Sequence, residues 1–199
     1  MVEAACVHPR DGTLAMIETE QALIRALAAG DGQALGRAMD LYLRAVYAVA
    51  HGMLGNHADA EDICQEVFLR LHQSARRLDP ERPLRPWLYK TCVNCCLDEL
   101  RRRAHRPRAG LEALELRPTP VLGPEQVATE RQFKEQVAAC LLRLPPRQRA
   151  VFVLRHLGGM DTPEIARALG CAPGTVKSHL ARALVSLRWM LPKEPEAER

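Results

Sequence analysis

The stretch from Thr162 to Leu191, TPEIARALGCAPGTVKSHLARALVSLRWML, predicts two helices joined by a short turn. We expect Thr162 to cap the first helix, with Pro163 at its first helical position and Gly170 at its end. A second helix follows the turn and continues to about Leu191. A short helix, a turn that contains glycine and a longer amphipathic helix form a helix-turn-helix arrangement.

The second of these helices has an apolar side and a basic side. Its apolar residues recur at helical spacing: Val176, Leu180, Leu184, Leu187 and Leu191. The N-terminal turn carries small or hydrogen-bonding residues, with an arginine one turn further on: Gly174, Thr175, Lys177, Ser178 and Arg182. Such a turn can enter the major groove of DNA and donate hydrogen bonds to base edges. An ordinary helical hairpin with a solvated basic side would show the same pattern, so the pattern alone leaves both interpretations open.

Composition favours an all-α fold for the whole chain of 199 residues. Hydrophobic residues make up 47% and charged residues 26%, which is typical of a globular protein with a buried core. Aromatic residues make up only 4%, whereas strands are enriched in aromatic and β-branched side chains. No apolar run is long enough to span a membrane and no secretory signal pattern is present, so we expect a cytoplasmic protein without direct membrane insertion.

The net charge of +4 is divided unevenly along the chain. Residues 1–100 carry 10 basic and 14 acidic side chains, a net of −4. Residues 101–199 carry 18 basic and 10 acidic side chains, a net of +8. A basic half favours contact with nucleic acid, and an acidic half indicates a different partner.

The N-terminal half shows two further amphipathic helices. The first is expected over Leu35–Met53, where apolar residues such as Met39 and Val46 recur at steps of three and four. Asn56 followed by Asp59 predicts the N-cap of the second helix. Its apolar side is expected to consist of Ile63, Val67, Phe68 and Leu71, and its opposite side is an acidic and polar stripe of Asp59, Asp62, Gln65 and Glu66.

Proline and arginine interrupt the helices after this stripe. Residues Ser74–Pro86 hold three prolines and four arginines, which predicts an extended basic loop. Helix is expected to resume at Trp87, whose ring we expect to pack inward. We therefore predict two small helical domains joined by a flexible linker, with a flexible segment at 1–20, a first domain at 21–104, the linker at 105–124, a second domain at 125–191 and a tail at 192–199.

Several motifs, in this order, resemble those of a known family. They are DAEDICQEVFLRLH at Asp59–His72, Trp87-Leu88 followed by Asn94, Asp98 and Arg101, LPPRQRAVFVL at Leu144–Leu154, and EIARALGCAPGTVKSHLARA at Glu164–Ala183. Together they are similar to the extracytoplasmic-function (ECF) group of bacterial RNA polymerase sigma factors over about residues 21–191. The resemblance implies an N-terminal region 2, a flexible linker and a C-terminal region 4.

The resemblance implies a role for each charged surface. In the family the acidic helix docks on a coiled coil of the largest polymerase subunit, and the matching positions are Asp62, Gln65 and Glu66. Without the family, a solvated helix face would be the simpler interpretation of this stripe. The basic loop and the following helix melt the −10 promoter element and capture a non-template base. The residues implied there are Arg76, Arg77, Arg82, Arg85, Asn94, Arg101, Arg102 and Arg103.

Region 4 would read the −35 element, and the matching positions are Lys177, Ser178 and Arg182. Arg147 and Arg149 are expected to contact phosphates or polymerase. The sequence departs from the family where Ala172 replaces a serine cap of the recognition helix. The implied partners are core RNA polymerase, promoter DNA that is duplex at −35 and melted at −10, and an anti-sigma factor that clamps the two domains.

Nothing in the sequence indicates an active site, a metal or a cofactor. It contains no metalloprotease, hydrolase, phosphate-loop or dinucleotide-binding motif, so we expect no catalysis. Cys92, Cys95 and Cys96 would share one helical face, where core packing is favoured over a metal or redox sensor because no second pair of ligands follows. The main alternative function is a stand-alone helix-turn-helix regulator whose N-terminal half is a sensor domain.

Overall fold

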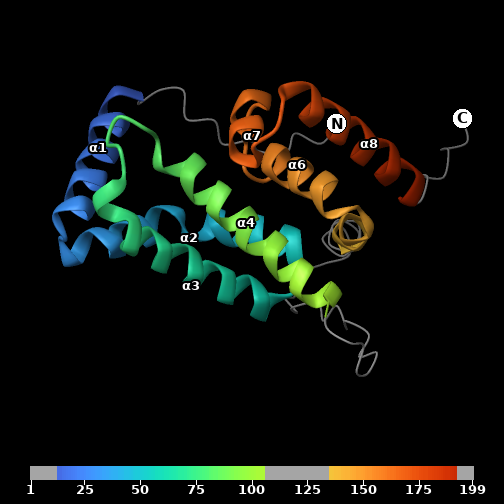
Figure 1. Cartoon of the computed structure of the whole chain (residues 1–199), viewed down its shortest axis with the longest axis horizontal. Coiled ribbons are helices and arrows are strands. Elements are labelled where there is room, and N and C mark those ends of the chain that lie inside the picture. The colour runs from blue at the N-terminus through green and yellow to red at the C-terminus, as the bar shows by residue number, and fades with distance from the viewer. Residues whose placement is uncertain (1–12, 106–134, 192–199) are drawn as a thin grey trace, which may run out of the picture.

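A computed structural model of the chain is helical in every regular element of its described residues, which confirms the predicted all-α class (Figure 1). The N-terminal half contains α1 (Thr13–Ala29), α2 (Gly32–Leu54), α3 (His57–Ser74), the 3-10 turn η1 (Ala75–Arg77) and α4 (Leu84–His105). The C-terminal half contains a helix over residues 135–143, α6 (Pro146–His156), α7 (Thr162–Leu169) and α8 (Pro173–Met190).

The structure describes residues 13–105 and 135–191. The predicted linker from residue 106 onward and the predicted tail at 192–199 therefore lie outside the described residues. Among the helices that are described, none combines the length and the apolar character that crossing a membrane requires.

Local capping interactions set the ends of several helices. The Asn56 side chain precedes α3 and accepts a hydrogen bond from the Asp59 N–H at 2.8 Å, as predicted. Gly170 ends α7 with a φ of 63°, a left-handed conformation that glycine adopts without steric cost. Pro173 then begins α8, and Ala172 before it supplies no side-chain cap, also as predicted.

The start of α7 differs from the prediction, because Asp161 rather than Thr162 is its N-cap. The Asp161 carboxylate accepts a hydrogen bond from the Glu164 N–H at 2.8 Å, and the Glu164 carboxylate accepts one from the Asp161 N–H at 2.8 Å. This capping box satisfies two backbone donors reciprocally, which favours the acidic residue as the cap. Thr162 is instead the first helical residue and Pro163 the second.

The chain between α3 and α4 is less extended than predicted. Ala75–Arg77 form η1, and α4 begins at Leu84 rather than at Trp87. Proline is tolerated in the first turn of a helix because the N–H groups there have no acceptor within the helix, so Pro86 does not delay α4. The part without helix is confined to residues 78–83, and a turn lies within it.

α1 begins at Thr13 and therefore includes residues 13–20 of the segment that the sequence indicated to be flexible. It packs against α2 and η1 and buries Leu23, Ile24 and Leu27. Most of the stability of such a helix comes from packing against neighbours rather than from intrinsic propensity. These neighbours are not visible in a local sequence pattern.

The two halves pack against each other around a shared hydrophobic core. Buried residues of α2, α3 and α4 form one cluster with those of α6 and α7. One close approach is at Gly52 in α2, where an added Cβ would lie 2.9 Å from Leu157 Cδ1 and 3.2 Å from Val153 Cγ2. Glycine at this position therefore allows α6 to lie directly on α2. A smaller cluster within the C-terminal half consists of Cys140, Leu141, Leu144, Ala183 and Leu187.

The predicted apolar sides of α3 and α8 differ in how completely they are buried. Along α3 the structure buries Ile63, Val67, Phe68 and Leu71, as expected. In α8 Val176 and Leu187 are buried, but Leu184 is 48% exposed and Ala183 takes the buried position beside it. The buried side of α8 is therefore narrower than the predicted stripe.

Candidate nucleic-acid interface

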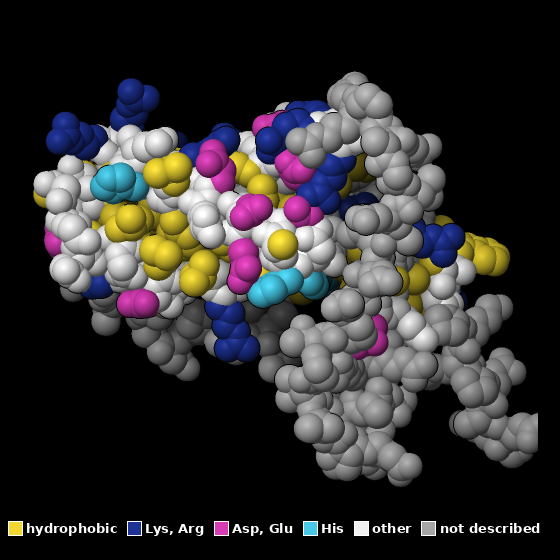
Figure 2. Space-filling model, turned by 90° about the horizontal axis from the view of Figure 1, so that it is seen from below, with side chains coloured by type: hydrophobic (Ala, Val, Ile, Leu, Met, Phe, Trp, Pro, Cys, Tyr) yellow, Lys and Arg dark blue, Asp and Glu magenta, His cyan; other side chains and the backbone are white. Residues whose placement is uncertain are grey.

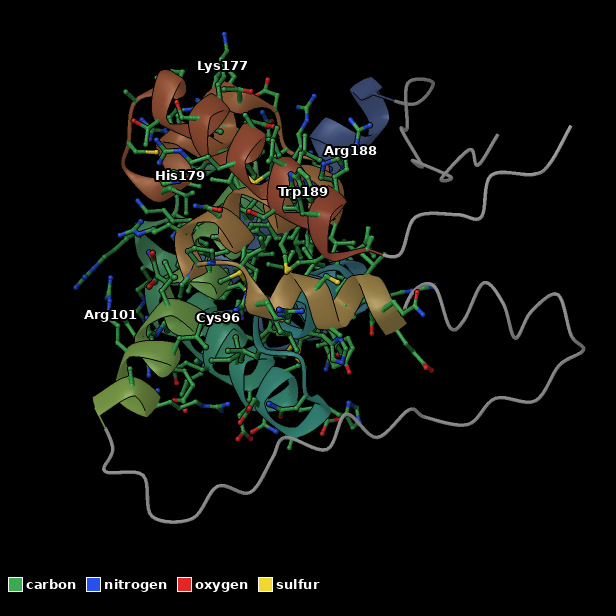
Figure 3. The ribbon with its side chains drawn as sticks, turned by 90° about the vertical axis from the view of Figure 1, so that its right-hand side faces the viewer. Cys96, Arg101, Lys177, His179, Arg188 and Trp189 are labelled. Carbon is green, nitrogen blue, oxygen red and sulfur yellow. The ribbon has the colours of Figure 1, made fainter. Side chains whose placement is uncertain are left out.

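The N-terminal end of α8 presents the residues that were predicted to read a major groove. All of these residues are exposed: Gly174, Thr175, Lys177, Ser178 and Arg182. Val176 faces the opposite way and packs into the core, which holds this end of α8 in place. Figure 3 shows Lys177 projecting from the outer end of α8. The helix contains no acidic residue, and its first N–H groups and dipole favour a phosphate at this end.

The segment between α3 and α4 presents a second group of basic side chains. Arg76, Arg77, Arg82 and Arg85 are exposed there, and Asn94 is exposed on α4. The Arg82 guanidinium lies 3.2 Å from the Asp79 carboxylate in an exposed ion pair, a weak interaction that DNA can replace. Trp87 is half-buried against the core, as predicted, and with Lys90 it lines a cleft of about 790 Å³ beside α7.

The three arginines at the end of α4 are not equivalent. Within residues 13–105 and 135–191, Arg101 and Arg102 pair only with carboxylates of the same helix, and their side chains are 61% and 69% exposed. The Arg103 side chain is 32% exposed and lies 2.5 Å from Asp59 of α3 and 2.8 Å from Glu99 of α4. Arg103 therefore links α3 to α4 and is less available to DNA than its two neighbours.

The Asp59 carboxylate depends on this link. Partial burial acts to raise the pKa of Asp59, but hydrogen bonds from Arg103 and Asn56 outweigh burial and hold the pKa below its ordinary value. A carboxyl group with a lowered pKa stabilises the fold above its unfolded-state pKa. That contribution is lost as the pH falls through the lower, folded-state pKa.

Arg103→Ala is expected to lower the free energy of unfolding by about 1 kcal/mol at neutral pH, because Asp59 loses its main partner. The difference from the wild type should shrink at a pH below the ordinary pKa of aspartate, because protonation of Asp59 removes the interaction from the wild type and the variant already lacks it. Urea unfolding at the two pH values measures the effect. Arg101→Ala is the control and should leave stability unchanged; a difference for Arg103→Ala that is independent of pH would contradict the assignment.

α3 presents the predicted acidic stripe on its outer side. Asp62 and Gln65 are exposed, and Glu66 is half-buried and accepts a hydrogen bond from Arg70 Nε at 2.6 Å. In the view from below (Figure 2), acidic side chains gather beside a patch of hydrophobic ones. Asp59 differs from the rest of the stripe because its carboxylate forms an ion pair with Arg103 of another helix, α4.

The structure adds an apolar groove that the sequence analysis missed. The groove has a volume of about 570 Å³ and lies between α2 and α3, where Met39, Leu43 and Phe68 line it together with Gln65 of the acidic stripe. Met39 was expected in the core but is 36% exposed. The available signal was a second apolar row at steps of four, Met39, Leu43 and Tyr47. An exposed apolar groove beside polar residues is typical of a protein docking site.

Arg149 is buried, so the prediction that it contacts phosphate or polymerase is wrong in this structure. Its side chain is 5% exposed and lies in α6. The guanidinium donates to Met53 O of α2 at 2.5 Å, to Leu144 O at 3.1 Å and to Leu142 O. The bond to Met53 O connects the two halves, since Leu142 and Leu144 belong to the same half as Arg149. Arg147, two residues earlier, is exposed.

Cys92, Cys95 and Cys96 are buried in α4, in agreement with a packing role. A hydrogen bond with Cys96 and burial raise the pKa of the Cys92 thiol, and burial raises the pKa of Cys95. Metal binding and most redox chemistry require the thiolate, which these environments disfavour. Across residues 13–105 and 135–191, no group of three or more His, Cys, Asp or Glu is arranged to hold a metal ion.

Family models match both halves of the chain. The model "Sigma-70 region 2" matches residues 38–106, and "Sigma-70, region 4" matches residues 134–187. ECF RNA polymerase sigma factor SigW of Bacillus subtilis (strain 168) is 30% identical over 176 residues, which cover 84% of this chain and 94% of SigW. ECF RNA polymerase sigma factor SigM of Mycobacterium tuberculosis (strain ATCC 35801 / TMC 107 / Erdman) is 34% identical over 169 residues, which cover 85% of this chain and 83% of SigM.

The helix-turn-helix and the separate basic segment define a DNA-binding protein of the transcription machinery. More specifically, the chain belongs to the ECF RNA polymerase sigma factors. The alternative function, a stand-alone regulator, is therefore not favoured.

Two solved structures share the fold. One is CnrH in complex with the cytosolic domain of CnrY, with a TM-score of 0.65, 24% identity and coverage of 86% of this chain and 96% of that chain. The other is the sigma factor RpoE in complex with the anti-sigma factor NepR from Bartonella quintana, with a TM-score of 0.64, 22% identity and coverage of 79% and 96%.

Proposed function

We propose that this sigma factor binds core RNA polymerase, recognises the −10 and −35 promoter elements and starts transcription of a specific set of genes. The observation that carries the proposal is the presence of three separate surfaces in the order of the family regions: the α3 stripe with its groove, the basic segment that leads into α4, and the exposed end of α8. A stand-alone regulator would need only the last. The proposed units are residues 21–104 and 125–191, and we assign neither a cofactor nor a catalytic step to them.

At the −35 element, the exposed end of α8 enters the major groove. Arg182 is suited to a bidentate contact with guanine, which is worth about 1–3 kcal/mol of discrimination against other bases. Lys177 acts as a point charge toward phosphate, and the Ser178 hydroxyl can bond either a base or a phosphate. Gly174 and Thr175 have small side chains, so the first turn of α8 can approach the DNA backbone closely.

At the −10 element, the basic segment offsets the cost of opening the duplex. Unstacking costs a few kcal/mol per base step, and exposed arginines can offset it through phosphate contacts. We assign this role to Arg76, Arg77, Arg82 and Arg85. Asn94 is placed to contact a base edge, and Arg101 and Arg102 to contact upstream duplex phosphates, with a smaller contribution from Arg103 because carboxylates already bind its guanidinium.

Core polymerase is proposed to dock on α3 through Asp62, Gln65 and Glu66 and through the adjacent groove. A coiled coil buries its apolar seam between its own helices and exposes charged side chains at the margins. The stripe suits basic side chains at such a margin, and Met39 and Leu43 in the groove suit an apolar side chain on the outer surface of the coil. The two features are continuous because Gln65 belongs to both.

The double variant Asp62→Ala, Glu66→Ala is expected to weaken binding to core polymerase by roughly tenfold, because two charges at the rim of the interface are lost. Its thermal unfolding should match the wild type, since Asp62 is exposed and Glu66 forms an ion pair with the exposed Arg70. Fluorescence anisotropy with labelled sigma factor measures the affinity. Binding of the same variant to duplex −35 DNA is the control and should be unchanged. An unchanged affinity for core polymerase would contradict the docking assignment.

We also propose an anti-sigma factor as a partner, by analogy with two proteins of the same fold. CnrH was solved with the cytosolic domain of CnrY, and RpoE with the anti-sigma factor NepR. An inhibitor that covered the groove between α2 and α3 would compete with core polymerase for the same surface. Polymerase and promoter DNA as partners would place this protein in the cytoplasm.

In vitro transcription tests the whole proposal. Purified protein is added to core polymerase and fragments of the source genome, and transcript starts are mapped by sequencing. We expect a small set of starts that share −10 and −35 sequences and are absent with core polymerase alone. If no template gave a specific transcript while the protein alone bound a palindromic operator, the regulator interpretation would replace this one.

A further inference from the structure

α1 lies beside the segment that leads from α3 into α4, which is the segment proposed to hold the −10 element (Figure 1). The buried side chains Leu23, Ile24 and Leu27 join the shared core and fix the helix there. Contacts between α1 and η1 place the helix against the start of the segment. Polar residues of α1 also reach the segment directly.

The Glu20 carboxylate connects α1 with α2 and α4 through one oxygen atom. Glu20 Oε1 accepts a hydrogen bond from the Tyr42 hydroxyl at 2.6 Å and another from the Leu84 N–H at 3.0 Å. Leu84 is the first residue of α4, so this N–H has no acceptor within the helix. A carboxylate here satisfies the donor and lies at the positive end of the helix dipole. Glu20 thus caps α4 from a different helix.

The Tyr42 hydroxyl holds this carboxylate in position. Burial, and next the hydrogen bond to Glu20, raise the pKa of Tyr42 well above its ordinary value. The hydroxyl therefore stays protonated and donates at any physiological pH. Arg85 of the first turn of α4 is near enough to act on the same pKa in the opposite direction. The cap therefore lies close to one of the arginines assigned to the −10 element.

A second set of contacts connects α1 to the loop before α4. Gln21 Nε2 donates a hydrogen bond to Glu81 Oε2 at 3.0 Å, and the Arg25 guanidinium lies 3.4 Å from Glu81 Oε1. Within the loop, the Glu81 N–H donates to the Asp79 carboxylate at 3.0 Å. Each contact is exposed and individually weak. Together they hold the backbone next to Arg82 against α1.

We infer that Glu20 is a positioning residue for −10 recognition, which fixes the start of α4 and the loop before it so that Arg82 and Arg85 meet the melted strand in one arrangement. This inference rests on the proposed function. A loop ordered in advance binds more tightly, because its conformational entropy is lost on folding rather than on binding. A purely structural role would instead lower the folded fraction and reduce −10 and −35 binding equally.

The test uses the full chain bound to core polymerase and two probes from a promoter mapped by transcription. One probe is the single-stranded non-template −10 sequence, and the other is a duplex that contains only the −35 element. Glu20→Ala removes the acceptor, whereas Glu20→Gln keeps an oxygen that can accept both hydrogen bonds. Asp40→Ala removes an exposed carboxylate of α2 and is the matched control.

We expect Glu20→Ala to weaken binding of the −10 strand by at least about fivefold and to leave −35 duplex binding within about twofold of the wild type. Glu20→Gln and Asp40→Ala should remain within about twofold of the wild type on both probes. Equal losses of Glu20→Ala on both probes would overturn the inference. So would a loss for Glu20→Gln as large as that for Glu20→Ala.

If Glu20→Ala does not fold, the double variant Gln21→Ala, Arg25→Ala tests the inference in its place. This variant removes only exposed contacts with Glu81. A loss of about twofold or more confined to the −10 strand supports the inference, and no loss overturns it. Absence of specific transcription by the wild type on every template would contradict the proposed function instead, so the two failures are distinguishable.

Discussion

Arg149→Ala is expected to lower the free energy of unfolding by about 3 kcal/mol, because it removes a buried cation that satisfies carbonyls of both halves. Each buried carbonyl left without a partner costs about 1–3 kcal/mol. Among the described residues Arg149 Nε has no hydrogen-bond partner, so part of the desolvation cost of the side chain is recovered in the variant. Because of this offset, the expected loss of stability is smaller than the summed cost of leaving the carbonyls of Met53, Leu142 and Leu144 without a partner.

Equilibrium unfolding in urea, followed by circular dichroism, measures this loss. Arg147→Ala is the matched control, since it removes an exposed arginine two positions earlier in the same helix. Its stability should stay within about 0.5 kcal/mol of the wild type. A loss of less than about 1 kcal/mol for Arg149→Ala would contradict the role of this guanidinium as a connection between α2 and α6.

The double variant Lys177→Ala, Arg182→Ala is expected to weaken binding of duplex −35 DNA by roughly 10- to 100-fold at moderate salt. Arg182 is assigned a base contact and Lys177 a phosphate contact, so the variant should lose sequence discrimination as well as affinity. Fluorescence anisotropy with the −35 duplex and with a scrambled duplex separates the two effects. The salt dependence of binding should also become shallower, because fewer counterions are released.

Arg188→Ala is the control for this prediction. Lys177 and Arg188 lie at opposite ends of α8, and Arg188 lies next to Trp189 (Figure 3). An exposed arginine so far from the groove-reading end should change the affinity by less than about twofold. A loss for Arg188→Ala as large as that for the double variant would show that α8 attracts DNA only through its overall charge.

Sequence was sufficient where the interaction is local. Asn56 and Asp59 are three residues apart, and Gly170 ends a short helix, so both caps follow from residue type and spacing. The error at Thr162 is also local, because Asp161 next to it is an equally good cap and only the Glu164 side chain decides between them. The exposed residues of α8 follow from periodicity.

Sequence was insufficient where a residue depends on distant parts of the chain. Arg149 bonds a carbonyl 96 residues away, and an arginine in a helix gives no local sign of such burial. Glu20 reaches Leu84 across 64 residues, from a segment with no strong apolar pattern. The groove at Met39 was missed because a helix with two apolar rows can bury either one, and tertiary packing makes the choice.

The shared core has a geometric consequence for promoter binding. The −10 and −35 elements lie roughly 25 base pairs apart, which corresponds to about 85 Å along B-form DNA. A compact body of this chain length has a diameter of about 40 Å. One rigid molecule of that size cannot reach both elements at once, so α6 and α7 must leave α2 and α4 before the promoter is fully engaged.

Separation exposes apolar side chains that are fully buried in the shared core, including Val153 and Leu154 of α6. Exposing such residues to water costs about 1.5–3 kcal/mol for each large side chain. The interactions that bring this sigma factor onto polymerase and DNA must therefore exceed the hydrophobic attraction between its own two halves. The distance between the two promoter elements therefore requires that the contact between α2 and α6 at Gly52 can open.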